Sequence, residues 1–78
     1  MTQPENSILY DLKGLKCPLP VLKTRKRLQA LESGEELIVD TTDPLAVIDI
    51  PHMCHEDGHK LLASEATAEG HRFYIRKG

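Results

Sequence analysis

The segment Gly14–Pro20 (Gly-Leu-Lys-Cys-Pro-Leu-Pro) holds the residue of this 78-residue chain that is best suited to chemistry, Cys17. Proline is tolerated in the first turn of a helix, and it forces the residue before it into an extended conformation. We therefore expect Cys17 to be the N-cap of a helix, where the helix dipole favours the nucleophilic thiolate. The two prolines also remove N–H donors, so the expected lowering of the thiol pKa is modest. Cys17 is the predicted catalytic residue, with Gly14, Pro18 and Pro20 positioning it.

Basic residues gather on both sides of Cys17. No acidic residue occurs between Asp11 and Glu32. Six basic residues lie in that interval: Lys13, Lys16, Lys23, Arg25, Lys26 and Arg27. We interpret the cluster as stabilising a thiolate and as docking acidic partners, with the last four residues contacting the partner. A solvated basic face is the alternative interpretation.

The composition is typical of a small globular protein. Hydrophobic residues make up 40% and charged residues 28%. The formal net charge of −2 argues against direct nucleic-acid binding. No apolar run is long enough to cross a membrane, and residues 1–7 lack a signal-peptide pattern. We therefore expect one cytoplasmic domain over residues 1–78, with residues 1–6 flexible, no membrane partner, and no need to be more than a monomer.

The chain alternates between strand and helix patterns. Strands are expected at 7–12, 35–42, 60–66 and 71–77, and helices from Pro18 or Pro20 to Leu31 and from Pro44 to Gly58. Asp43 is the expected N-cap of the second helix, and Pro51 predicts a kink or a restart near Ile50. The order β-α-β-α-β-β predicts a two-layer α/β (α+β) sandwich, with a four-stranded mixed sheet and both helices on one face.

Each predicted helix carries one stripe that should pack on the sheet. The stripes are Val21, Thr24, Leu28 and Leu31 in the first helix, and Ala46, Val47, Ile50 and Cys54 in the second. Cys54 is therefore expected to be an inert core thiol. Leu22 falls outside its stripe, among basic residues, as an exposed leucine or a docking contact.

The cluster His52, Cys54, His55 and His59 has some of the residue types of a metal site. Its spacing fits no standard zinc pattern, so we expect surface histidines and no metal. The sequence also lacks a Ser/His/Asp constellation, a phosphate-binding glycine loop and a paired-carboxylate motif. No cofactor is implied.

Motifs spread over nearly the whole chain form a pattern. They are Asp11, the Gly14–Pro20 segment with its Cys-Pro-x-Pro, Gly34-Glu35, Thr42-Asp43-Pro44, Asp49-Ile50-Pro51, Gly58-His59 and the closing Phe73–Gly78. With these motifs the chain resembles the TusA/SirA-like sulfur-carrier family. The resemblance implies a two-layer α/β sandwich and a sulfurtransferase that receives a persulfide on Cys17 from a cysteine desulfurase. A downstream acceptor protein would take the sulfur, for 2-thiouridine in tRNA or for the molybdenum cofactor. Arg25 matches a basic helix position that members use toward partners.

Two other functions fit the same residues. The basic first helix could serve a non-catalytic regulatory or RNA-binding module in which Cys17 is structural. The scarcity of aromatic residues argues against RNA binding. Alternatively, Cys17 and Cys54 could form a redox sensor, which requires their Cα atoms to lie within roughly 7 Å of each other.

Overall fold

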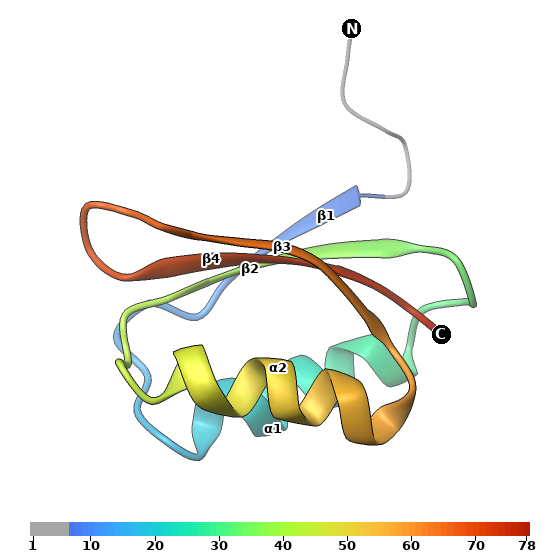
Figure 1. The fold of residues 1–78 in the computed structure, drawn as a ribbon, viewed down its shortest axis with the longest axis horizontal. Helices are drawn as coiled ribbons and strands as arrows, with labels where there is room; N and C mark the ends of the chain where they lie inside the picture. The colour runs from blue at the N-terminus through green and yellow to red at the C-terminus, as the bar shows by residue number, and fades with distance from the viewer. Residues whose placement is uncertain (1–6) are drawn as a thin grey trace, which may run out of the picture.

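The computed structural model describes residues 7–78 and places two helices on one face of a four-stranded sheet (Figure 1). The elements are β1 (Ser7–Asp11), α1 (Leu19–Gln29), β2 (Glu36–Thr41), α2 (Ala46–Asp57), β3 (Lys60–Ala66) and β4 (His71–Arg76). The predicted α+β fold and the order β-α-β-α-β-β are confirmed. The expected flexibility of residues 1–6 concerns a segment outside the described residues.

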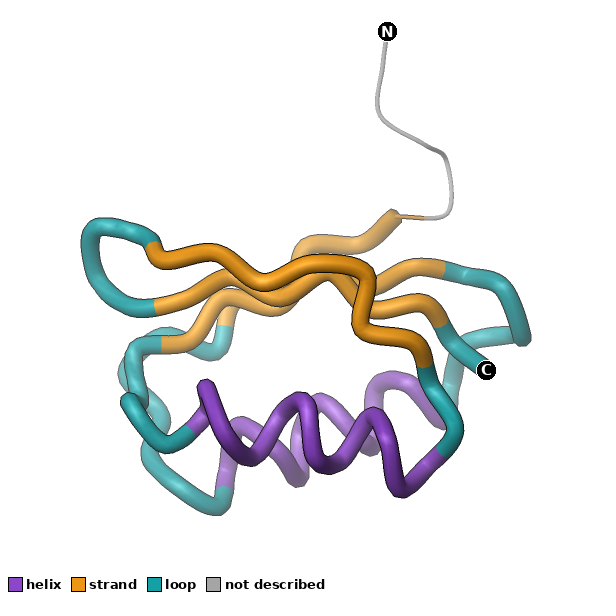
Figure 2. The backbone as a smooth tube through the Cα atoms, viewed as in Figure 1, coloured by secondary structure: helices purple, strands orange, loops and turns teal. Residues whose placement is uncertain are grey.

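The sheet has the strand order β1-β2-β4-β3. Strand β1 runs parallel to β2, whereas β4 runs antiparallel to both β2 and β3. Strand β2 is therefore an interior strand, as its continuous apolar centre predicts. Figure 2 shows the strands as one layer and the two helices as the other.

An aliphatic core fills the space between the two layers. Its buried residues are Leu12, Leu28, Leu37, Val39, Ala46, Ile50, Met53, Cys54, Phe73 and Ile75. Val39 and Phe73 pair across β2 and β4, so the sheet's contribution to the core is continuous between strands. Thr24 is also fully buried, as its place on the α1 stripe predicts.

Helix α1 begins and ends differently from the prediction. Its N-cap is Pro18, not Cys17, because the Leu19 N–H donates to the Lys16 carbonyl at 2.8 Å and closes a turn across Cys17. The helix ends at Gln29 rather than at Leu31.

Helix α2 also departs from the prediction at its start. Its N-cap is Leu45 rather than Asp43, because a turn precedes the helix and bonds the Ala46 N–H to the Asp43 carbonyl at 3.0 Å. The expected restart near Ile50 is wrong, since one helix runs from Ala46 to Asp57 with Pro51 inside it.

The apolar stripe of α2 is also shifted from the predicted one. Val47 is 42% exposed, whereas Met53 is buried. Val47 lies about 100° around the helix from Ala46, away from the middle of the buried stripe. The predicted end of α2 is confirmed, because Gly58 takes a left-handed conformation with φ 80°.

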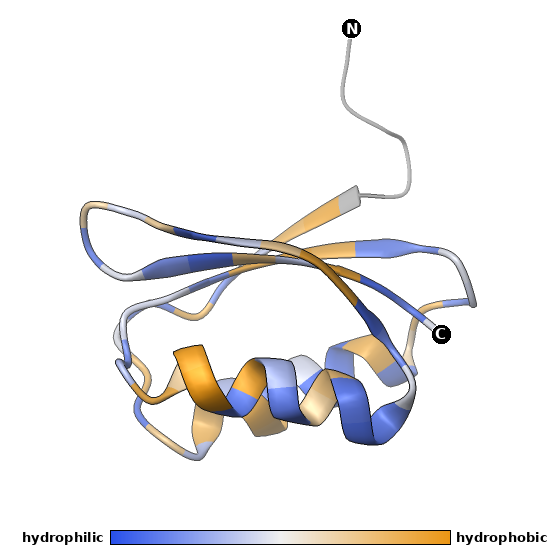
Figure 3. Cartoon of the chain, in the orientation of Figure 1, coloured by the Kyte–Doolittle hydropathy of each residue, from blue (hydrophilic) through white to orange (hydrophobic). Residues whose placement is uncertain are grey.

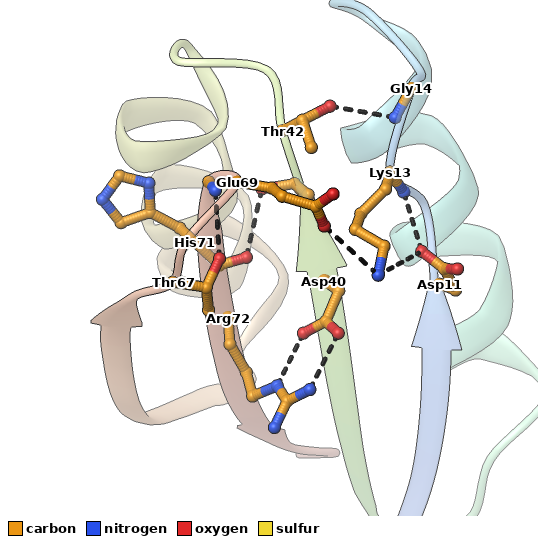
Figure 4. Close-up of polar contacts among 11 residues, drawn as sticks. Asp11, Lys13, Gly14, Asp40, Thr42, Thr67, Glu69, His71 and Arg72 are labelled. Atoms are coloured by element: carbon orange, nitrogen blue, oxygen red, sulfur yellow. Dashed lines mark hydrogen bonds and ion pairs between the residues drawn. The ribbon is translucent and has the colours of Figure 1, made fainter.

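The sheet face opposite the helices carries a short apolar row. Leu9, Ile38 and Tyr74 are paired from strand to strand, and Ala63 of β3 pairs with Tyr74. Charged pairs flank this row. The Arg72 guanidinium donates two hydrogen bonds to Asp40, at 2.6 and 2.9 Å (Figure 4), and Arg76 donates to Glu36 at 3.1 Å.

Candidate functional site around Cys17

Cys17 lies in the turn that leads into α1, and its thiol contacts Asp49 in the first turn of α2. Figure 1 shows that both helices begin at the same end of the helix layer. Cys17 is exposed, and its thiol is free. The side chain that the sequence singles out for chemistry is thus open to another molecule. Pro20, three residues further along, is fully buried and anchors the start of α1 in the core.

Two hydrogen bonds attach the segment that carries Cys17 to the loop between β2 and α2. The Cys17 N–H donates to Asp43 Oδ2 at 2.8 Å. The Gly14 N–H donates to Thr42 Oγ1 at 2.9 Å (Figure 4). Gly14 has a φ of 90°, a left-handed conformation that glycine adopts without strain. The positioning role of Gly14 stays a prediction.

The thiol of Cys17 faces a carboxylate rather than a cation. Cys17 Sγ donates a hydrogen bond to Asp49 Oδ2 across 3.5 Å. Partial desolvation of the sulfur, the hydrogen bond to Asp49, and the negative charges of Asp49 and Asp43 together raise the pKa of Cys17 above its ordinary value. The expected lowering of this pKa by the helix dipole and nearby lysines is therefore wrong for the isolated chain.

Lys13, one of the basic residues near Cys17 in sequence, is paired with carboxylates. Its ammonium lies 3.6 Å from Glu69 Oε1 and 4.0 Å from Asp11 Oδ1 (Figure 4). The charge that was expected to act on Cys17 is thus shared between two carboxylates at the edge of the sheet.

Three of the four predicted partner-binding residues lie together. Lys23, Lys26 and Arg27 line a surface hollow with Tyr10 and Ala30. The guanidinium carbon of Arg27 lies 5.2 Å from the centroid of the Tyr10 ring, in cation–π contact. Among residues 7–78, no ion pair involves any of these three cations. The hollow therefore presents positive charge that is not neutralised within the described chain.

Arg25, the fourth predicted partner-binding residue, points to a different surface. Its Nε donates to Asp57 Oδ2 at 2.7 Å. It lines a second hollow with Gln29, Asp57, His59, Lys77 and Gly78. The structure therefore divides the predicted basic surface into two parts.

Cys54 occupies the core position predicted for it and is 1% exposed. Burial, with a smaller contribution from the charge of Asp57, raises the pKa of Cys54 to about 11. This thiol is therefore almost entirely protonated at neutral pH.

The histidines near Cys54 have other neighbours. His52 Nε2 lies 3.3 Å from Glu56 Oε2, and His59 Nδ1 accepts a hydrogen bond from the Gly78 N–H at 3.0 Å. Within residues 7–78, no group of three or more His, Cys, Asp or Glu side chains is arranged to hold a metal ion. The helices in this range also include none with the length and apolar character needed to cross a membrane.

Two carboxylates contact Cys17 that no sequence pattern assigned to the thiol, Asp43 and Asp49. The sequence predicts Asp43 only as an N-cap and Asp49 only as part of a family motif. Both residues belong to motifs that carry the family resemblance, Thr42-Asp43-Pro44 and Asp49-Ile50-Pro51, and this membership is the sequence feature that could have indicated a role at the site. Tyr10 of the basic hollow was also missed, because its strand pattern indicates only an inward-facing residue.

Comparison with known families identifies the family to which this chain belongs. The family model described as "Sulfurtransferase TusA" matches residues 8–77, a range that contains both helices and the Cys17 segment. The chain belongs to the TusA family. This TusA-family chain is 40% identical over 72 residues to the "Putative sulfur carrier protein YrkF" of Bacillus subtilis (strain 168). The similarity covers 92% of this chain but only 39% of that relative, so the chain spans about two fifths of the relative's length.

Proposed function

We propose that this TusA-family chain is a sulfur carrier whose Cys17 accepts a sulfur atom as a persulfide and passes it on. The observation that carries the proposal is the exposed sulfur of Cys17, which projects where the two helices begin, outside the core. The relative named "Putative sulfur carrier protein YrkF" and the family match over residues 8–77 support it. The proposed carrier domain spans residues 1–78.

The proposed reaction resembles thiol–disulfide exchange. The Cys17 thiolate attacks the outer sulfur of a donor persulfide, R–S–SH. A bond forms between Cys17 Sγ and that sulfur, while the S–S bond of the donor breaks and its electron pair leaves with the donor sulfur. The proton lost by Cys17 ends on the donor, so the products are R–SH and a Cys17 persulfide. Transfer to the acceptor repeats these steps with Cys17 as the leaving group.

The family resemblance supports the finer parts of the proposal. The donor is a cysteine desulfurase, and a downstream protein is the acceptor, in a cytoplasmic pathway to 2-thiouridine in tRNA or to the molybdenum cofactor. The chain acts as a monomeric sulfurtransferase without a cofactor and without direct contact to nucleic acid. Lys23, Lys26 and Arg27 dock an acidic surface of the partner, because their charges are unpaired within residues 7–78. Arg25 contributes from the neighbouring hollow.

Persulfide loading of Cys17→Ser tests the proposal directly. The wild-type chain, Cys17→Ser and Cys54→Ser are incubated with a cysteine desulfurase and free cysteine, and intact masses are then measured without reductant. We expect one added sulfur atom on the wild type and on Cys54→Ser, and none on Cys17→Ser. Equal loading of Cys17→Ser, with its fold verified by circular dichroism, would refute the assignment of Cys17.

The same masses test the redox-sensor alternative. A sensor that joins Cys17 to Cys54 would lose two hydrogen atoms on oxidation and gain no sulfur. The burial of Cys54 and its raised pKa speak against such a disulfide. For the RNA-binding alternative, a gel shift with tRNA at two salt concentrations is the test, and we expect no salt-dependent complex.

A further inference from the structure

Two carboxylates from different parts of the chain meet at Cys17. Asp43, in the loop after β2, accepts the Cys17 N–H at 2.8 Å, and its other oxygen accepts the Leu45 N–H at 3.4 Å. Asp49, in the first turns of α2, accepts the thiol proton across 3.5 Å. Asp43 is therefore committed to the backbone, whereas Asp49 acts on the sulfur itself.

These surroundings disfavour the thiolate, which is the nucleophilic form of a cysteine. Reactive thiolates usually lie beside cations or metal ions, whereas a carboxylate that accepts the thiol proton favours the neutral form. Partial desolvation of the sulfur contributes most to the raised pKa of Cys17, followed by the hydrogen bond to Asp49 and the charges of Asp49 and Asp43. Lys13 is paired with acidic residues, whereas for Lys16 no ion pair occurs within residues 7–78. The hydrogen bond that Asp49 accepts from Cys17 Sγ favours the neutral thiol in the isolated chain.

Exposed apolar side chains lie on the segments that flank this acidic pair. Leu19 at the start of α1 is 43% exposed, and Leu45 and Ile48 at the start of α2 are 49% and 66% exposed. Figure 3 shows the beginning of α2 as a strongly hydrophobic part of the helix layer. An exposed apolar patch bordered by polar groups is typical of protein-binding surfaces. We call Leu19, Leu45 and Ile48 the apolar rim.

We propose that Asp49 is a positioning residue that holds Cys17 as a neutral thiol until a docking partner places a cation beside Asp49. This inference rests on the proposed sulfur-carrier function. The occupant of the apolar rim is a protein segment with apolar side chains and a Lys or Arg next to its own reactive sulfur. Charge complementarity with Asp43 and Asp49 selects such a segment over one with an acidic or neutral neighbour.

A partner's cation beside Asp49 would make Cys17 reactive. When the partner's cation pairs with Asp49, the carboxylate no longer accepts the thiol proton, and its negative potential at the sulfur is compensated. Cys17 then releases its proton to water and attacks the outer sulfur of the partner's persulfide. The partner's sulfur leaves as a thiolate and takes a proton from water. Atoms and charge balance as in the proposed reaction, and no oxidant or reductant is needed.

The thiol part of the proposal is tested by the pH dependence of alkylation. Rates of iodoacetamide reaction at Cys17 are measured for the wild type, Asp49→Asn, Asp49→Glu and Glu56→Gln, the last removing a carboxylate elsewhere on α2. In Asp49→Asn we expect the midpoint of the alkylation rate against pH to shift to lower pH, and the alkylation rate at neutral pH to rise several-fold. Asp49→Glu should remain close to the wild type, and Glu56→Gln should match it. Coinciding midpoints for the wild type and Asp49→Asn would overturn the proposal.

The cation part is tested with two small persulfides that need no docking surface. Cysteamine persulfide carries an ammonium group beside its sulfur, whereas glutathione persulfide is net negative. We expect the wild type to load sulfur from the cysteamine compound in preference to the glutathione compound, and Asp49→Asn to lose most of that preference. If the ratio of loading from the two persulfides is the same in the wild type and in Asp49→Asn, selection by Asp49 is refuted. Failure of the wild type to gain sulfur from either compound would instead count against the sulfur-carrier function, while the alkylation profiles still decide the state of the thiol.

Discussion

Arg25 of α1 donates to the carboxylate of Asp57 at the end of α2, with 2.7 Å between Nε and Oδ2. The two side chains are 34% and 29% exposed. Because water screens such a pair, Arg25→Ala should lower the free energy of unfolding by no more than about 1 kcal/mol. The exchange variant Arg25→Asp with Asp57→Arg should restore most of that loss. Urea unfolding of Arg25→Ala and of the exchange variant measures both effects.

The same variants separate the structural role of Arg25 from its proposed role toward a partner. If Arg25 contacts the desulfurase directly, the exchange variant recovers stability but not affinity. Recovery of both would show that Arg25 acts only by holding the helices together.

The basic hollow should govern the rate of partner association. Reversing charge at Lys26 and Arg27 to Glu should slow association with an acidic partner about tenfold or more at low salt, because steering by exposed charges is strong there. The effect should shrink as salt is raised. Surface plasmon resonance with a desulfurase at two salt concentrations measures it.

A matched control and an internal check accompany this test. Lys60→Glu reverses an exposed charge on β3 and should have little effect on association. Alkylation of Cys17 by iodoacetamide should be unchanged in all three charge-reversal variants, since none of these cations touches the thiol. Equal slowing by Lys60→Glu would mean that net charge alone, and not the hollow, sets the rate.

Cys54 should be protected in the folded chain and reactive only after unfolding. Its burial raises its pKa to about 11, and no path to solvent is open at 1% exposure. Iodoacetamide at neutral pH should therefore modify one cysteine in the native chain and two in concentrated urea, as counted by mass spectrometry. Equal rates for both cysteines in the native chain would contradict the core position of Cys54.

The pair of Asp40 and Arg72 should make part of the stability depend on acid pH. The hydrogen bonds from Arg72 hold the pKa of Asp40 below its ordinary value, although partial desolvation opposes the shift. A folded-state pKa below the unfolded one adds stability that is complete above the unfolded pKa, near about 3.9. That stability is lost as the pH falls through the folded-state pKa.

Asp40→Asn tests this linkage. The variant should be less stable than the wild type at neutral pH, and it should lose less further stability than the wild type between pH about 5 and about 2. Urea unfolding across this range gives the comparison. An unchanged pH dependence in Asp40→Asn would assign the acid sensitivity to other carboxylates.

The fold could be predicted from the sequence because the patterns that indicate it are local. Alternation along β4 predicts that Phe73 and Ile75 face the core while Arg72 faces away, and all three do so. Helical spacing likewise predicts the burial of Thr24 and Leu28. Such patterns extend over a few residues, and the two-layer packing leaves only one way to bury them.

The surroundings of Cys17 were not accessible in the same way. Asp49 lies 32 residues away in sequence, and no local pattern indicates that α2 brings its carboxylate to the thiol. The lysines adjacent to Cys17 in sequence suggested the opposite electrostatic environment. The N-cap was misplaced for a related reason, because a turn closed between Lys16 and Leu19 competes with the capping geometry expected before a proline.

The row of Leu9, Ile38 and Tyr74 on the outer side of the sheet leaves one flank of the molecule free of the groups around Cys17. A fluorophore or a surface tether fixed at Ala63, beside Tyr74, would thus stand on the side away from the helices. The loading and release of sulfur could then be measured on a single immobilised molecule, because the end that carries Cys17 remains accessible to other proteins.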